Sequence, residues 1–179
     1  DTEISGAIGT SGTASGNAEL LTTITATATN TGTATLTNVY ADDSTNSTTD
    51  LAMTVTGTAG TNSTIAFGTI VNTYGTIALT TSGLGTAGST ALTADDITGT
   101  ISAIGTHAAM TATDDITLTV SNAGAVILSA LTAGAAATGA ITVTATGAGA
   151  LTISDVNASA GAFTVTGTDA TGIITVAGG

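Results

Sequence analysis

The chain contains no lysine, arginine, cysteine or proline, and these absences exclude several classes of function before any motif is considered. Twelve acidic residues give a formal net charge of −12, so the chain would repel nucleic acids, whose phosphates are neutralised by Lys and Arg. Insertion into or binding to an anionic membrane surface is disfavoured for the same reason. Without cysteine, a disulfide framework, a thiolate zinc site and a cysteine nucleophile are impossible.

Aromatic residues make up only 2% of the chain and charged residues only 7%, against roughly 25% charged residues in typical soluble domains. Even so, 42% of the 179 residues are hydrophobic, which is enough for one domain with a buried core. Glu, Lys, Arg and Gln, the usual surface residues of helices, are rare or missing, whereas β-branched Thr, Val and Ile dominate. The composition therefore predicts an all-β protein.

Period-two alternation supports this prediction. Threonine occupies every odd-numbered position from Thr23 to Thr37, and mostly apolar residues lie between. We expect Ile24, Ala26, Ala28, Ala34 and Leu36 to point inward and the threonines to point outward. Asn30-Thr31-Gly32 interrupts the pattern and predicts a turn, because Asn and Gly tolerate positive φ.

Similar alternating segments recur along the chain, with Gly, Asn, Asp and Ser between them. The uncharged segment 123–143 is long enough to span a bilayer, but three glycines punctuate it and we expect two short strands instead. The predicted strands lie near residues 20–29, 33–41, 51–56, 63–71, 76–80, 97–104, 116–120, 125–129, 140–146, 150–154, 162–166 and 172–176.

Two all-β architectures compete. The late strands begin at uneven intervals of 10 to 15 residues, which favours an antiparallel β-sandwich of jelly-roll type over a parallel β-solenoid with regular coils. One near-repeat, DDITGT at Asp95 and DDITLT at Asp114, does not continue elsewhere. The sandwich is therefore the favoured prediction and the solenoid the alternative.

Segments DTEISG (1–6), NAELL (17–21) and TATNTGTATLTNVY (27–40) resemble the start of the TasA/camelysin family of extracellular fibre proteins, which includes archaeal bundling-pilus subunits. The rest of the chain resembles surface-layer and large-adhesin repeats. The fibre-protein resemblance implies a sandwich, here residues 17–179, that is completed by a strand exchanged from a neighbouring subunit. Residues 1–16 would supply the donor strand and linker, with Ile4, Gly6 and Ile8 on one face.

Few residues are candidates for chemistry. The acidic clusters provide hard oxygen ligands suited to calcium, and the candidate metal ligands are Asp42, Asp43, Asp95, Asp96, Asp114 and Asp115. Sequons make Asn46, Asn62 and Asn157 candidate glycosylation sites. His107 is the only histidine; a Ser102–His107–Asp114 triad lacks the motif of a nucleophile elbow, so we expect a surface or packing residue and no enzyme.

Three functions follow as hypotheses. The first is a structural subunit of an extracellular filament or pilus that associates with itself and supports biofilm formation or cell–cell adhesion. The second is a surface-layer or adhesin β-solenoid that binds calcium. The third is an ice-binding β-protein, since hydroxyls at positions i and i+2 lie about 6.6 Å apart on a strand; threonine ladders of unequal phase argue against a single flat array. We expect an exported protein whose signal peptide has been removed, with no cofactor other than calcium.

Overall fold

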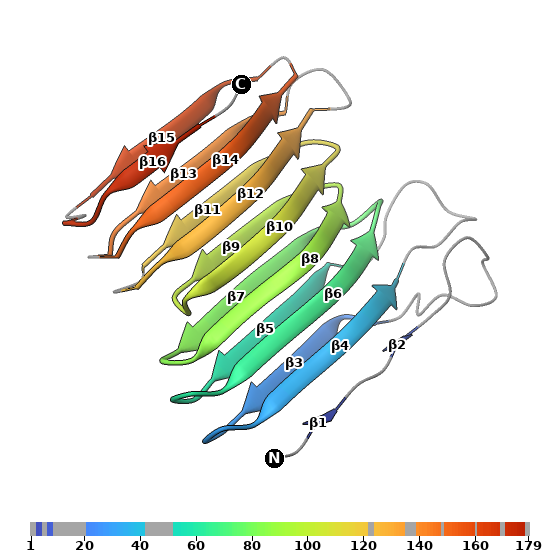
Figure 1. Ribbon diagram of the computed structural model, residues 1–179. Coiled ribbons are helices and arrows are strands. Elements are labelled where there is room, and N and C mark those ends of the chain that lie inside the picture. Colours follow the sequence, from blue (N-terminus) through green and yellow to red (C-terminus); the bar gives the residue numbers. More distant parts are fainter. Residues whose placement is uncertain are drawn as a thin grey trace.

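The computed structural model describes residues 3–4, 7–8, 21–41, 52–121, 124–134, 139–147, 149–159, 161–168 and 171–177. These residues form two parallel β-sheets that face each other, with no helix among them (Figure 1). From residue 23 onward, the chain alternates between the two sheets, called sheet A and sheet B, so that each coil adds one strand to sheet B and then one to sheet A. The protein is therefore a parallel β-solenoid.

Sheet B has seven strands and sheet A nine. The strands of sheet B are β3 (Thr23–Ala28), β5 (Met53–Ala59), β7 (Ile77–Gly83), β9 (Ile97–Ile101), β11 (Ile116–Val120), β13 (Ile141–Ala145) and β15 (Phe163–Gly167). The strands of sheet A are β1 (Glu3–Ile4), β2 (Ala7–Ile8), β4 (Thr33–Tyr40), β6 (Thr64–Asn72), β8 (Thr86–Ala94), β10 (Gly105–Ala112), β12 (Val126–Ala133), β14 (Leu151–Ala158) and β16 (Ile174–Val176).

The predicted antiparallel jelly-roll sandwich is wrong, and the solenoid alternative is correct. From β3 onward, strands that follow one another in sequence lie in opposite sheets, and every pairing joins one coil to the next in parallel. Uneven strand spacing misled the prediction because corner loops absorb the differences. The coil length varies from 18 residues, between Ser89 and His107, to 31 residues, between Ile24 and Val55, while the register stays intact.

The near-repeat of DDIT segments is the coil repeat itself. Ile97 pairs with Ile116, 19 positions later, and Ile116 pairs in turn with Ile141. This column continues from Met53 to Phe163 along sheet B. The coil repeat continues along sheet B, but the residues at the equivalent positions of the other coils differ from DDIT, so the repeat is not visible in the sequence.

The core lies between the sheets and consists almost entirely of aliphatic side chains stacked in such columns. The predicted inward residues Ile24, Ala28 and Ala34 are buried, and Ala26 and Leu36 pack partly buried against them. Phe67 is the largest fully buried side chain. The period-two pattern thus predicted the orientation of these side chains correctly.

The predicted turn at Asn30 exists, but it is a corner of the coil and not a hairpin. Asn30 has φ 57° and the Gly32 N–H donates to the Thr29 carbonyl over 3.1 Å. The next coil turns at Asn62 with φ 61°. Positive φ at both corners reverses the chain within a few residues and sends it into the opposite sheet.

Two strands were not predicted, β8 and β10, because their Ala, Gly, Ser and His residues have low β propensity. They form because each lies between two paired neighbours in sheet A. Segment 123–143 contains the two expected strands, β12 and the start of β13. Among the described residues, no helix has the length and hydropathy needed to cross a membrane.

Candidate functional site: the threonine face of sheet B

The outward face of sheet B, called the threonine face below, carries threonine from every coil. One row runs through all seven strands without interruption because the register aligns the middle threonine of each strand with the next. We call it the middle rank; it consists of Thr25, Thr56, Thr80, Thr100, Thr119, Thr144 and Thr166.

A second rank lies two residues earlier on each strand. It contains threonine in every strand except β7, where Ala78 takes the position. Its members are Thr23, Thr54, Ala78, Thr98, Thr117, Thr142 and Thr164. The threonines of both ranks are exposed or partly exposed.

A third rank of hydroxyls borders the middle rank at the strand ends. The Thr58 and Ser82 hydroxyls are 3.3 Å apart, and the Ser102 and Ser121 hydroxyls are 3.0 Å apart. Backbone hydrogen bonds such as Thr146 N–H to Val120 O extend the ladder through these positions. The third rank consists of Thr27, Thr58, Ser82, Ser102, Ser121, Thr146 and Thr168.

The backbone fixes the spacing of these hydroxyls. Neighbouring threonines of one rank are separated by the distance between adjacent strands, about 4.8 Å, and the ranks by two residues of a strand, about 6.6 Å. Figure 1 shows the strands stacked with little rotation from one to the next. Threonine is β-branched and therefore stiff at χ1, so the side chains keep this lattice with little loss of entropy on binding.

No strand of sheet B contains a charged residue. A shallow hollow of about 310 Å³ lies on this face, where Ala78 stands in the second rank in place of a threonine. Its lining residues are Ala78, Leu79, Thr80, Thr98, Gly99, Thr100, Thr117 and Thr119. The face therefore offers hydroxyl and methyl groups in a two-dimensional lattice, with room for water between the ranks.

The threonine face is not evident from the sequence alone. The expectation that the threonine ladders are unequal in phase is wrong, because the middle rank stays in register through all seven strands of sheet B. The shared T-x-T triplets of sheet B were the available signal, for example Thr117-Leu118-Thr119 and Thr142-Val143-Thr144. They align only when coils of different length are superposed.

The candidate calcium ligands that the structure describes lie at two stacked corners. The Asp96 carboxylate accepts from the Asp115 N–H at 3.1 Å, and the Asp115 carboxylate accepts from the Ala140 N–H at 2.7 Å. Burial, followed by the charges of Asp96 and Asp114, raises the pKa of Asp95. Within the described chain, no three acidic or histidine side chains gather closely enough to hold a metal ion. Asp42 and Asp43 lie outside the described residues.

The remaining candidates are dispersed. Ile4 and Ile8 belong to β1 and β2, which pair in parallel with β4 of the same chain, and Gly6 lies outside the described residues. Exchange of this segment between subunits stays a prediction. Of the sequons, Asn62 is exposed at a corner and Asn157 is exposed on β14, whereas Asn46 lies outside the described residues.

His107 does not join Ser102. It is buried in β10, inside the core, where Nδ1 lies 2.9 Å from the Ser89 hydroxyl. Among the residues that the structure describes, none forms a hydrogen bond with its Nε2. Ser102 instead lies on the threonine face, where it contacts Ser121. The expectation of a packing residue thus fits the burial of His107, although the residue lies in a strand and not in a loop.

The buried His107 predicts a loss of stability in acid. Burial lowers its pKa to about 4, from an ordinary value of 6.5, so only the unfolded chain gains the proton between these values. Stability should therefore fall by about 3 kcal/mol as the pH falls from 7 to 4. Urea unfolding at a series of pH values measures it. Because the raised pKa of Asp95 acts in the opposite direction, the comparison is with His107→Gln, which does not titrate and should flatten the profile. Equal profiles would contradict the prediction.

Comparisons with protein-family models, with curated proteins and with solved structures gave no match.

Proposed function

We propose that this β-solenoid binds ice through the threonine face. The observation that carries the proposal is the middle rank, unbroken over seven strands, together with the parallel rank beside it. Rows of oxygen atoms on the prism face of ice have spacings similar to the strand separation and the two-residue repeat. A protein surface with that lattice holds water in ice-like positions.

The chemistry of threonine suits this task. Each hydroxyl donates and accepts hydrogen bonds with water, while the methyl group beside it offers little hydration of its own. Charged side chains would bind water more strongly and in other geometries, and sheet B has none. The hollow beside Ala78 provides space for ordered water between the ranks. Water bridging of this kind is nearly as favourable as direct hydrogen bonding.

The experiment is a measurement of thermal hysteresis with the purified chain, together with observation of growing ice crystals. We expect a gap between the melting and freezing temperatures, and faceted crystals whose growth stops within that gap. Recrystallisation of ice in frozen solutions should slow at the same time. Round, freely growing crystals at the highest soluble protein concentration would overturn the proposal.

The second candidate is a structural β-solenoid of the cell surface, such as a surface-layer or adhesin segment. The coil stack favours it, because a solenoid presents a long rigid body whose strands at either end offer backbone groups for further pairing. Electron microscopy distinguishes its forms: thin fibres support the filament hypothesis, and two-dimensional lattices that assemble only with calcium support a surface layer. Dispersed single particles both with and without calcium would contradict this candidate.

A further inference from the structure

The two ends of sheet B are complementary, whereas at the N-terminal end of sheet A β1 and β2 already pair with β4. Among the described residues, β15 pairs only with β13 at one end of sheet B, and β3 pairs only with β5 at the other end. Figure 1 shows these strands at opposite ends of the stack. β15 is therefore an edge strand with one unpaired side. Because all strands of sheet B are parallel, a further parallel strand such as β3 could pair with that side.

Backbone hydrogen bonds identify the groups on each open edge. On either side of β15, the Ala162 carbonyl and the Thr168 N–H form hydrogen bonds with β13. The backbone N–H and C=O groups of even-numbered residues therefore point toward β13. Val165 and its odd-numbered neighbours therefore direct their N–H and C=O groups to the open edge. In β3, the Thr22 and Ala28 carbonyls bond to β5 and its neighbouring corner, which leaves Thr25 and the other odd-numbered residues facing the opposite open edge.

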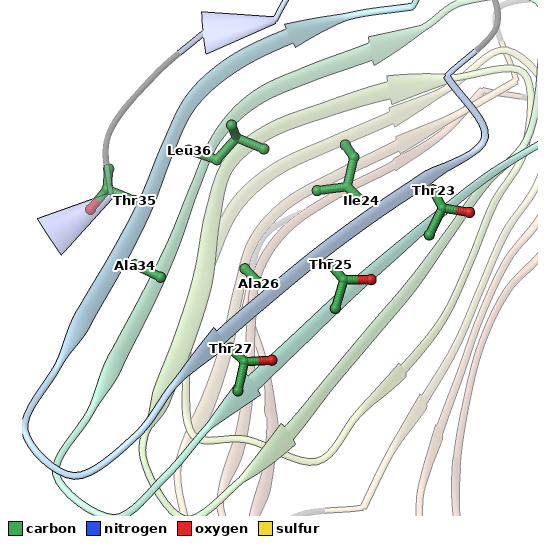
Figure 2. A pocket seen from close by; sticks show the side chains of 8 residues that line it. All are labelled: Thr23, Ile24, Thr25, Ala26, Thr27, Ala34, Thr35 and Leu36. Carbon is green, nitrogen blue, oxygen red and sulfur yellow. The ribbon is translucent and has the colours of Figure 1, made fainter. Parts of the chain in front are cut away.

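The end surfaces are apolar. Phe163 and Val165 pack on the core from one side and remain only partly buried. At the other end lies a hollow of about 290 Å³ between β3 and β4. Figure 2 shows Ile24, Ala26 and Leu36 pointing into it, whereas Thr23, Thr25 and Thr27 point away. Covering both surfaces would remove this apolar area from water, which favours association.

Among the described residues, neither edge strand carries a feature that blocks pairing. Natural edge strands are usually blunted by lysine, by inward-pointing charge or by proline. TITATA in β3 and FTVTG in β15 contain none of these. The net charge of −12 on each copy opposes association, but screening limits this repulsion to about 8 Å at 0.15 M salt.

We propose that a second copy of this chain docks end to end, with its β3 paired in parallel to β15 of the first copy. In the coil register, Ile24 and Val165 belong to the same core column, so Thr25 of one copy would lie beside Thr166 of the other. The contact is head-to-tail and open, so it continues into a chain of copies. Each added copy lengthens the middle rank of the threonine face.

The first test uses sedimentation velocity at about 0.15 M salt, where the Debye length is about 8 Å. The unmodified chain should form oligomers whose size grows with concentration. Thr25→Pro and Val165→Pro each remove an edge-facing N–H and should each give monomers, while Thr25→Val, which keeps the N–H, should associate normally. An equimolar mixture of the two proline variants should form dimers and nothing larger, because one intact edge of each kind remains.

Cysteine cross-linking provides a second test that does not require proline in a strand. Residues in register on adjacent strands have Cα atoms about 4.8 Å apart, within the range for a disulfide. A chain carrying Thr25→Cys and Thr166→Cys should oxidise to a ladder of covalent multimers, since the natural chain has no cysteine. A chain with Thr25→Cys and Thr111→Cys, on sheet A, should not. A monomeric unmodified chain, or a ladder from the control alone, would overturn the proposal, whatever the ice measurements show.

Discussion

Thr100→Tyr should reduce the affinity of the protein for ice at least about tenfold, equivalent to about 1.4 kcal/mol. Thr100 belongs to the middle rank on the central strand of sheet B, with Thr80 and Thr119 beside it. A tyrosine ring would stand above these neighbours and hold them away from a flat ice surface. The loss should therefore exceed the contribution of one hydroxyl. Thermal hysteresis as a function of protein concentration measures the effect.

The matched control for this substitution is Thr111→Tyr. Thr111 is exposed near the end of β10 on sheet A and pairs with Thr93 and Thr132, so the same side chain is added to a paired threonine position on the opposite face. We expect unchanged thermal hysteresis. Both variants should unfold within about 0.5 kcal/mol of the unmodified chain, because the changes are on the surface. Equal loss of thermal hysteresis in both variants would contradict the proposal that the threonine face is the binding surface.

Substitution of one hydroxyl without added bulk separates shape from hydrogen bonding. Thr100→Val keeps the branched shape of the side chain and removes the hydroxyl. If the methyl lattice supplies most of the contact with ice, this variant should retain most of the activity. If the hydroxyl is needed to hold water in the hollow, its loss should approach that of Thr100→Tyr.

Phe67→Ala should produce the largest loss of stability of any single core substitution, about 3–5 kcal/mol. Phe67 is 1% exposed and lies between Leu36 and Ser89 in its column of sheet A. The aliphatic columns around it cannot collapse into the space because each is held in register by two neighbouring coils. Urea unfolding followed by circular dichroism measures the change. Tyr74→Ala, at a corner where the side chain is 40% exposed, serves as the control and should have little effect.

A second variant shows what the Phe67 ring packs against. A Cβ atom at Gly57, on the facing strand β5, would lie 3.0 Å from the ring, so the ring fills the volume that this glycine leaves open. Gly57→Ala alone should cost about 1–3 kcal/mol through overpacking. In combination with Phe67→Leu, its cost should fall, because the smaller side chain makes room for the methyl group. Additive costs would show that the two residues are not coupled.

The local pattern of the sequence established much of the fold correctly. Alternation of apolar residues with threonine predicted an all-β chain and the inward orientation of Ile24 and Ala34, because side chains on a strand alternate between its two faces whatever its partners are. The Asn30 turn was predictable because its positive φ is a local property.

Only the tertiary structure decided that the strands are parallel and how the coils align. Period-two alternation is the same in a parallel coil and an antiparallel hairpin, and corner loops of unequal length hide the repeat along the chain. Packing of columns such as Ile97 on Ile116 sets the register, and that register brings the threonines of seven separate strands into one lattice. The candidate site is a property of alignment between coils, so no single segment of the sequence contains it.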